Sequence, residues 1–457
     1  MLFTKRDLRR LVLPLICEQL LAVTVGMADT VMVAFAGEAA MSGVALVDSI
    51  TMLLTQIFAA LCTGGAVVVS QLLGRGDGEG AGRAAGQLVQ LTAGLSLLLT
   101  GAALALRGVL LRGIFGGVEP AVMAAAQTYF WISALSFPFL GVYNAGAALL
   151  RSIGDTASSL RIALVMNLVN LGGNAWLIYG RGLGAAGAAI ASLAARAAAA
   201  DGVRAVILTR AAAAAAIGLV LYHRQKPFCL RGQVLRRPEW KTAAAILRIG
   251  VPSGLENGMF QIGKLLVQRL VAGFGTVAIA ANAAAGNIAC IATIPGSAVS
   301  LALLSVVGRC MGAGQPDEAA TDTKRLLMAA FASMGVLNGL VFLGLGPIVG
   351  VYGLSAATAE LTARLMAWHC LFAALLWTPA FCLPSALRGA GDVSFTMKVS
   401  IVSMWVCRIG GSYLLAAGLG LGLLGVWLAI FLDWLARAAL FALRFWRGRW
   451  REQRVLR

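Results

Sequence analysis

Runs of apolar residues, separated by short polar intervals, follow one another along the whole chain of 457 residues. A helix that crosses a bilayer needs about 20 consecutive apolar residues. By that measure the chain holds twelve candidate spans, which lie approximately at residues 11–36, 45–73, 85–111, 121–150, 160–180, 184–222, 245–274, 282–311, 324–352, 360–386, 396–418 and 422–446. The pattern predicts an all-α integral membrane protein with twelve transmembrane helices.

The sixth span, at residues 184–222, is too long for a single crossing. Asp201, Arg204 and Arg210 interrupt its apolar sequence, and a run of alanines follows at 211–216. We therefore expect an irregular or inserted segment over residues 196–216. Basic residues precede the first span, as in a cleaved leader, but its apolar run is too long for a leader, so we expect it to stay as a membrane helix.

Composition and charge agree with a membrane location. Charged residues make up only 12% of the chain and hydrophobic residues 60%, whereas a soluble protein carries about 25% charged residues. The net charge of +18 comes from 37 Lys and Arg against 19 Asp and Glu. If the N-terminus is cytoplasmic, the outer loops hold only Arg107, Arg112, Arg181 and Arg364. This positive-inside asymmetry predicts that both termini are cytoplasmic.

The basic excess is therefore a topology signal, and anionic membrane lipid supplies its counter-charge. We expect membrane lipid as a partner and no nucleic acid. The expected location is a bacterial-type cytoplasmic (inner) membrane, crossed many times. The eight cysteines and two histidines have no metal-ligand spacing, so no metal site is expected.

The two halves of the chain repeat each other. Pro14 and Glu18 in the first span are matched by Pro252 and Glu256 in the seventh, an offset of 238 residues. An even number of spans in each half gives both copies the same orientation, and parallel repeats of this kind are a known transporter plan. We expect two pseudo-symmetric six-helix lobes, at residues 1–222 and 242–457, joined by a basic cytoplasmic linker at 223–241.

Two further motifs occur once in each half. Leu-Arg-x-x-Gly-Asp ends helices on the cytoplasmic side, and we interpret Arg151 with Asp155, and Arg388 with Asp392, as Arg–Asp clamps that close turns. Gly-x-Gly-x-x-Gly occurs at 182–187 and 420–425. A dinucleotide site would need a preceding strand, which is not expected here, so these glycines indicate tight turns.

Charged residues inside the spans are candidates for function, because a charge at mid-bilayer costs about 2.5–3.5 kcal/mol on insertion scales. The candidates are Glu18 and Asp29 in the first span, Glu256, Lys264 and Arg269 in the seventh, and Arg408 in the eleventh. Asp433 and Arg437 in the last span stand four residues apart, a spacing typical of an ion pair within a helix.

A buried carboxyl can take up a proton in place of its charge, and the same carboxylate attracts a cation when it is ionised. Competition of proton and cation for one site is the physical basis of antiport. Asn167, Asn170 and Asn174 in the fifth span fall near one helix face. They either form a polar site with Asp29 or bind a neighbouring helix. Lys264 either pairs with an acid or faces the cavity.

These residues give the chain a resemblance to the multidrug and toxic compound extrusion (MATE) family of antiporters. The resemblance rests on Pro14…Asp29-Thr30, on Val251-Pro252-Ser253-Gly254-Leu255-Glu256, on the paired Leu-Arg-x-x-Gly-Asp turns and on the C-terminal stretch 425–450. It implies two six-helix lobes that alternate between outward and inward openings. It also implies export of cationic lipophilic drugs or metabolites in exchange for H⁺ or Na⁺. We further expect a monomer with no cofactor and no enzymatic activity.

The resemblance also implies roles for single residues. Asp29 falls on the family's proton-coupling acid, Asn170 and Asn174 fall on its polar partners, and Glu256 falls on the acid of the Na⁺-coupled branch. That branch uses a further acid in the tenth span, where this chain has none at 376–380. H⁺ is therefore the expected coupling ion rather than Na⁺.

Two alternatives stay open. A flippase for lipid-linked or anionic precursors, of the same superfamily plan, would line its cavity with several basic residues, as Lys264, Arg269 and Arg408 could do. A membrane enzyme would need a catalytic cluster or large loops, and the sequence has neither.

Overall fold

The computed structural model describes residues 2–115, 119–220, 239–453 and 455. Every regular element in this part of the chain is helical, as the apolar pattern predicted. Within these described ranges, nine helices are long and apolar enough to cross a membrane, and one bent helix pair would add a tenth. Residues 223–238 of the expected basic linker lie outside the described residues.

The chain divides into two compact units. The N unit comprises Leu20–Val251, and the C unit comprises Met1–Gln19 together with Pro252–Arg457. The boundaries fall inside the two helices α1 (Lys5–Ala34) and α8 (Trp240–Ala272), which contain Pro14 and Pro252. A proline removes one backbone hydrogen bond and weakens its helix locally. One unit boundary lies at Pro252, and the other lies a few residues after Pro14.

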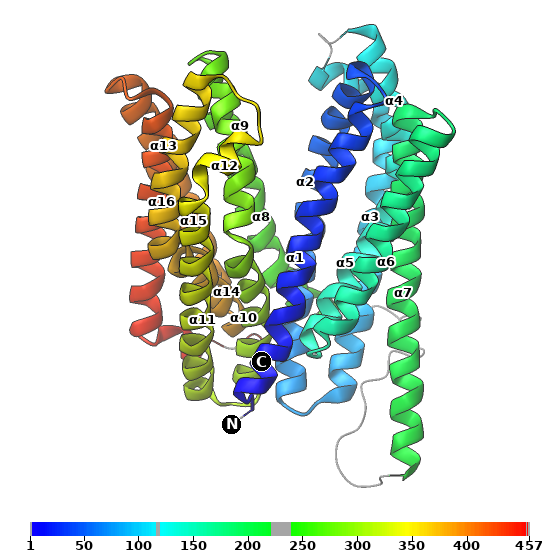
Figure 1. Cartoon of the computed structure of the whole chain (residues 1–457). Helices are drawn as coiled ribbons and strands as arrows, with labels where there is room; N and C mark the ends of the chain where they lie inside the picture. Colours follow the sequence, from blue (N-terminus) through cyan, green and yellow to red (C-terminus); the bar gives the residue numbers. More distant parts are fainter. Residues whose placement is uncertain (1, 116–118, 221–238, 454, 456–457) are drawn as a thin grey trace. The chain divides into compact units, whose positions relative to one another are not determined.

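The N unit contains the second part of α1, the first part of α8 and the elements between them (Figure 1). These elements are α2 (Glu38–Gly74), α3 (Gly78–Phe115), α4 (Pro120–Leu135), α5 (Phe137–Ser152), α6 (Thr156–Asn174), the π-helix η1 (Ala175–Gly180) and α7 (Gly184–Val220). Helix α2 packs against α3, α4 and α5, and α7 packs against α4, α5 and α6.

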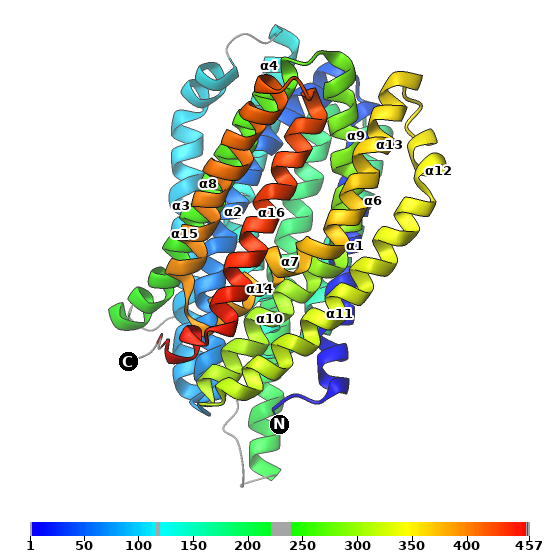
Figure 2. The same ribbon diagram turned by 90° about the vertical axis from the view of Figure 1, so that its left-hand side faces the viewer.

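The C unit holds the first part of α1, the rest of α8 and the elements that follow it. These are α9 (Thr276–Ala292), α10 (Ile294–Gly312), α11 (Pro316–Leu343), α12 (Leu345–Gly350), α13 (Ala356–Phe372), η2 (Ala373–Cys382), α14 (Leu383–Ala390), α15 (Val393–Ser403), η3 (Met404–Gly410), η4 (Tyr413–Gly418), α16 (Gly422–Trp446) and η5 (Arg449–Glu452). Figure 2 shows α16 in red beside α15, and α16 also packs against η2, η3 and η4.

Each of the twelve predicted spans corresponds to one helix or to one run of consecutive helical elements among the described residues. The fourth span consists of α4 and α5, which meet at Ser136 with a bend of 50°. Pro138 stands just after the bend and cannot donate the backbone hydrogen bond that a continuous helix would use there. The first turn of α5 is therefore the natural place for this break.

The expectation of an irregular segment at 196–216 was wrong. Figure 1 shows α7 as one uninterrupted helix, and it runs from Gly184 to Val220. Alanine is the strongest helix former, so the alanine run extends the helix. At 1.5 Å per residue, 37 residues measure about 55 Å, which exceeds the ~30 Å hydrocarbon core. The excess length of the span is therefore helix outside the hydrocarbon layer.

The paired Gly-x-Gly-x-x-Gly segments are turns, as predicted. Gly182, Gly184, Gly420 and Gly422 have positive φ angles of 65°, 51°, 70° and 54°. Such angles are strained for residues with a Cβ atom, and glycine adopts them freely. The first copy lies between η1 and α7 and extends into α7, and the second lies between η4 and α16 and extends into α16.

Candidate functional site

A polar cavity of about 280 Å³ lies in the N unit. It is lined by residues of α1, α2, α4, α6 and α7, and its charged or hydrogen-bonding members are Asp29, Thr30, Asp48, Tyr129, Asn174, Ser192 and Arg196. Helices α1 and α2 each contribute one carboxylate, and α7 contributes the guanidinium. Because the polar lining groups come from five different helices, the fold of the N unit is what brings them together.

Asp29 is half-buried, and two amides of α6 hold its carboxylate. The Asn174 side chain donates from Nδ2 to Oδ1 of Asp29 over 2.8 Å. The hydrogen-bond network orients the Asn170 amide with its nitrogen toward Asp29, at 2.8 Å from Oδ1 and 2.9 Å from Oδ2. In that orientation the Asn170 oxygen accepts from the Ser192 hydroxyl over 3.2 Å. Among the described residues, no basic group forms an ion pair with Asp29.

The sequence grouped three amides of the fifth span with Asp29, and the structure brings two of them to it. Asn170 and Asn174 are buried and point to the carboxylate. Asn167, one turn earlier on α6, is only half-buried and does not line the cavity. The polar site is thus present, and the ion-coupling role of its residues stays a prediction.

Sequence reasoning missed two charged residues of this cavity, Asp48 and Arg196. The Tyr129 hydroxyl donates to Oδ1 of Asp48 over 3.1 Å, and Nη1 of Arg196 donates to the Ser136 hydroxyl over 2.5 Å. Ser136 is the residue at the α4–α5 bend. Both missed residues are charges inside apolar spans, so the criterion that selected Asp29 could have found them. With two carboxylates and one guanidinium, the ionised cavity favours a cation.

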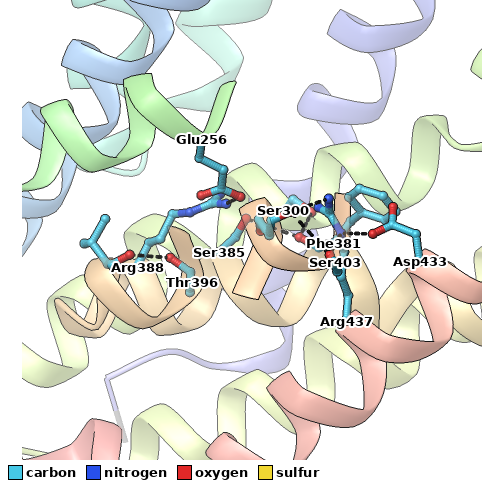
Figure 3. A network of polar contacts seen from close by, with 11 residues as sticks. Glu256, Ser300, Phe381, Ser385, Arg388, Thr396, Ser403, Asp433 and Arg437 are labelled. Carbon is cyan, nitrogen blue, oxygen red and sulfur yellow. Dashed lines mark hydrogen bonds and ion pairs between the residues drawn. The ribbon is translucent and has the colours of Figure 1, made fainter. Parts of the chain in front are cut away.

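The other two predicted acids lie elsewhere. Glu18 and Glu256 are buried, belong to the C unit and line neither this cavity nor the C-unit cavity described below. Nη2 of Arg388 donates to Oε1 of Glu256 over 2.6 Å, as Figure 3 shows. The charge of Glu256 is therefore already matched by a basic side chain, whereas that of Asp29 is not.

The prediction of an Arg388–Asp392 clamp was wrong. Arg388 binds Glu256, and Asp392 accepts two hydrogen bonds from Arg444 of α16, at 2.7 and 3.2 Å. Gly391, between the two expected partners, has a φ of 101° and ends α14, so Asp392 begins the next helix in a new direction. In the first copy of the motif, Asp155 caps α6 by accepting from the backbone N–H of Ser158. Asp155 and Arg151 both have further polar contacts.

The predicted ion pair within the last span is confirmed. Nε of Arg437 lies 2.8 Å from Oδ1 of Asp433 and also donates to the Ser403 hydroxyl over 2.9 Å (Figure 3). Arg408 of η3 approaches the same carboxylate, with Nε at 3.2 Å from Oδ2. One fully buried carboxylate therefore stands between two guanidinium groups.

A second cavity, of about 460 Å³, lies in the C unit, and Lys264 and Arg408 line it. The π-helical segments η2 and η3 contribute Trp377, Phe381 and Arg408 to its wall. The sequence left open whether Lys264 pairs with an acid, and the structure places it at a cavity instead. Among the described residues, no group of three or more His, Cys, Asp or Glu side chains could hold a metal ion.

Comparisons with known proteins agree with this architecture. A model of the MatE family matches the chain twice, over residues 14–176 and 252–414, so the second match begins 238 residues after the first (252 against 14). The "Probable multidrug resistance protein NorM" of Thermotoga maritima is 25% identical over 99% of this chain and 94% of its own length.

Solved structures share the fold at lower identity. A crystal structure of MATE in complex with MaL6 covers 97% of this chain and 96% of its own, with a TM-score of 0.86 and 20% identity. A MOP superfamily transporter from Pyrococcus furiosus, described as having a binding pocket whose reverse polarity suggests a different function, covers 97% of this chain and 95% of its own. Its TM-score is 0.84 and its identity 20%.

The duplicated helical units and the cavities within them define a multi-pass membrane transporter. The family model matches well over half of the chain, in two copies at the spacing of the internal repeat. The chain belongs to the MatE family.

Proposed function

We propose that this transporter exports cationic lipophilic compounds in exchange for H⁺, with the exchange taking place at Asp29. The observation that carries the proposal is the set of groups around this carboxylate. It faces a cavity, two amides hold it, and no basic residue of the described chain pairs with it. A proton or a cationic substrate can therefore each supply the missing positive charge.

Competition at one carboxylate couples the two fluxes. A substrate cation binds well only when Asp29 is ionised, and protonation from the opposite side of the membrane removes that attraction. The cavity then alternates between outward and inward openings. Asn170 and Asn174 orient the carboxylate, and Asp48 adds a second negative charge that attracts the substrate.

The surroundings of Glu256 support H⁺ over Na⁺ as the coupling ion. Na⁺ binding would need Glu256 as an oxygen ligand, and Arg388 holds that carboxylate at 2.6 Å. A coupling role for Glu256 would require Arg388 to move away first. We propose that Asp29 carries the coupling and that Glu256 with Arg388 mainly supports the C unit.

The multidrug relatives support this substrate class, since the NorM protein of Thermotoga maritima is named a probable multidrug resistance protein. We place the chain in a bacterial-type cytoplasmic membrane with both termini in the cytoplasm, acting as a monomer.

Efflux of ethidium from proteoliposomes tests the proposal. An imposed H⁺ gradient should drive efflux, an equal Na⁺ gradient should not, and Asp29→Asn should abolish the H⁺-driven flux while the protein still inserts. Asn167→Leu is the matched control, because Asn167 lies on α6 but does not line the cavity. This variant should keep wild-type H⁺-driven efflux. Equal efflux by wild type and Asp29→Asn would reject the role of Asp29.

The second candidate function is a flippase for lipid-linked or anionic precursors. Lys264 and Arg408 favour it, because both line the C-unit cavity. Translocation of a fluorescent anionic lipid between leaflets, without any ethidium flux, would favour this function over drug export.

A further inference from the structure

The C-unit cavity differs from the N-unit cavity in the sign of its charge. Its described lining contains Lys264 and Arg408 and no carboxylate. Asp433, behind the wall, is fully buried and bonds to Arg437 at 2.8 Å. Counting these four groups in their ionised forms, the region carries three positive charges and one negative charge.

Neither basic residue of the wall has its charge fully matched. Lys264 is exposed toward the cavity, and no carboxylate of the described chain lies within 4.0 Å of its ammonium group. Arg408 is only 6% exposed, and its Nε makes no hydrogen bond although it lies 3.2 Å from Asp433. Asp433 is shared with Arg437, so the Arg408 guanidinium keeps hydrogen-bonding capacity for a group in the cavity.

The Phe260 ring lies among these cations. Its centroid lies 5.3 Å from Nζ of Lys264, 5.0 Å from Cζ of Arg408 and 5.7 Å from Cζ of Arg437. A cation–π contact contributes about 0.5–2 kcal/mol. Burial of a charge costs several kcal/mol even after relaxation. One shared ring therefore does not replace an anion as the partner of the buried Arg408.

The rest of the wall is aromatic. Trp377 stacks on Phe381 with centroids 5.0 Å apart, and Phe381 meets Trp434 edge-on at 5.9 Å. His369 lies against Trp427 and Trp434 at 5.7 and 5.5 Å. Aromatic walls with a few convergent polar groups are typical of sites for small organic molecules, and the volume of about 460 Å³ suits a compound of drug size.

We propose that the C-unit cavity is a binding site for aromatic organic anions. A sulfonate or carboxylate group lies between Lys264 and Arg408, and the attached ring system packs against Trp377, Trp427 and Phe381. Charge-assisted hydrogen bonds to two cations fix the acidic group, and the aromatic wall takes the apolar body. This site is separate from the cation site at Asp29 and does not rest on the proposed exchange mechanism.

Binding of naphthalene-1-sulfonate, measured by calorimetry, tests the proposal with the full chain in phosphatidylcholine nanodiscs. No ion gradient is present, so the outcome does not depend on whether Asp29 couples transport to H⁺. We expect the sulfonate to bind at least tenfold more tightly than the uncharged naphthalene-1-sulfonamide. Lys264→Met and Arg408→Met should each weaken sulfonate binding about tenfold and leave sulfonamide binding nearly unchanged.

Arg269→Met is the matched control. Arg269 is an exposed cation on the same helix as Lys264 and does not line the cavity, so its loss removes the same charge without touching the site. Lys264 is exposed, so Lys264→Met decides the test if Arg408→Met fails to fold. Sulfonate binding that Lys264→Met leaves unchanged, or that Arg269→Met weakens equally, would overturn the proposal.

A further measurement identifies the source of the anion. Phosphatidylglycerol added to the nanodiscs competes with the sulfonate only if a lipid headgroup reaches the cavity. If phosphatidylglycerol competes with the sulfonate in the wild type and not in Lys264→Met, the result supports the proposed site and identifies a lipid headgroup as its natural ligand. Sulfonate binding that phosphatidylglycerol leaves unchanged supports it with a soluble anion.

Discussion

Arg388 of α14 binds Glu256 of α8 over 2.6 Å, although the sequence pattern predicted Asp392 as the partner of Arg388. The contact joins two helices of the C unit and matches the charge of the acid that repeats Glu18 of the first half. Of the acids predicted to couple transport, Asp29 is the one that lines a cavity. No basic residue of the described chain forms an ion pair with it. The account of coupling therefore rests on the N unit.

Loss of Arg388 should destabilise the protein. In Arg388→Met the carboxylate of Glu256 stays buried without its partner, and breaking a buried pair in this way costs about 3–5 kcal/mol. Heating in detergent micelles, followed by tryptophan fluorescence, should give a midpoint several degrees lower. Glu256→Gln combined with Arg388→Met should recover much of the loss, because the unpaired charge is then absent.

Arg451 provides the comparison for this experiment. It forms an exposed ion pair with Asp317 at 3.0 Å. Exposed pairs contribute about 0–1 kcal/mol, so Arg451→Met should barely change the midpoint. If the two single substitutions have equal effects, the Arg388–Glu256 contact contributes no more than a surface pair.

Asn174 should be needed for transport more than for folding. Asn174→Leu removes the amide that donates to Asp29 over 2.8 Å, so the carboxylate loses a hydrogen bond that stabilises its charged form. We expect H⁺-driven ethidium efflux to fall about tenfold in proteoliposomes. Asn167→Leu removes an amide about two turns earlier on the same helix, outside the cavity, and should retain wild-type efflux. Equal losses in both variants would indicate a general requirement of α6.

The fold could be predicted well from the sequence because long apolar runs have few alternatives in a membrane. A spanning segment must satisfy its backbone hydrogen bonds internally, so each run becomes a helix. The α4–α5 break at Ser136 and the continuous α7 were missed. The break depends on local geometry next to Pro138, and the alanine run at 211–216 was read as an interruption although alanine favours helix.

The site was predicted in part, for a physical reason. Asp29, Asn170 and Asn174 are rare polar residues in apolar helices, and the structure joins them. The partners of Arg388 and Asp392 could not be predicted, because Glu256 and Arg444 lie 132 and 52 residues away along the chain. Helical periodicity orders contacts along one helix and does not specify which helices meet.

Arg196 should weaken cation binding in the N-unit cavity. Its guanidinium lines the same cavity as Asp29 and Asp48 and opposes their attraction for a cation. Removing one positive charge near the bound cation changes its binding free energy by about 1 kcal/mol, roughly fivefold in affinity. Arg196→Gln should therefore bind ethidium more tightly, and Asp48→Asn more weakly, as measured by fluorescence titration at low ionic strength. If both substitutions change the ethidium affinity in the same direction, the electrostatic explanation is wrong.

Proton release on substrate binding tests the central role of Asp29 most directly. Ethidium is titrated into the purified protein in weakly buffered detergent solution, at several pH values from roughly 5 to 8, while an indicator dye reports the pH. At a pH where Asp29 is protonated, each ethidium bound to the wild type should release about one proton, and binding to Asp29→Asn should release none. Equal release from both proteins, or ethidium binding without release at every pH, would contradict exchange at this carboxylate.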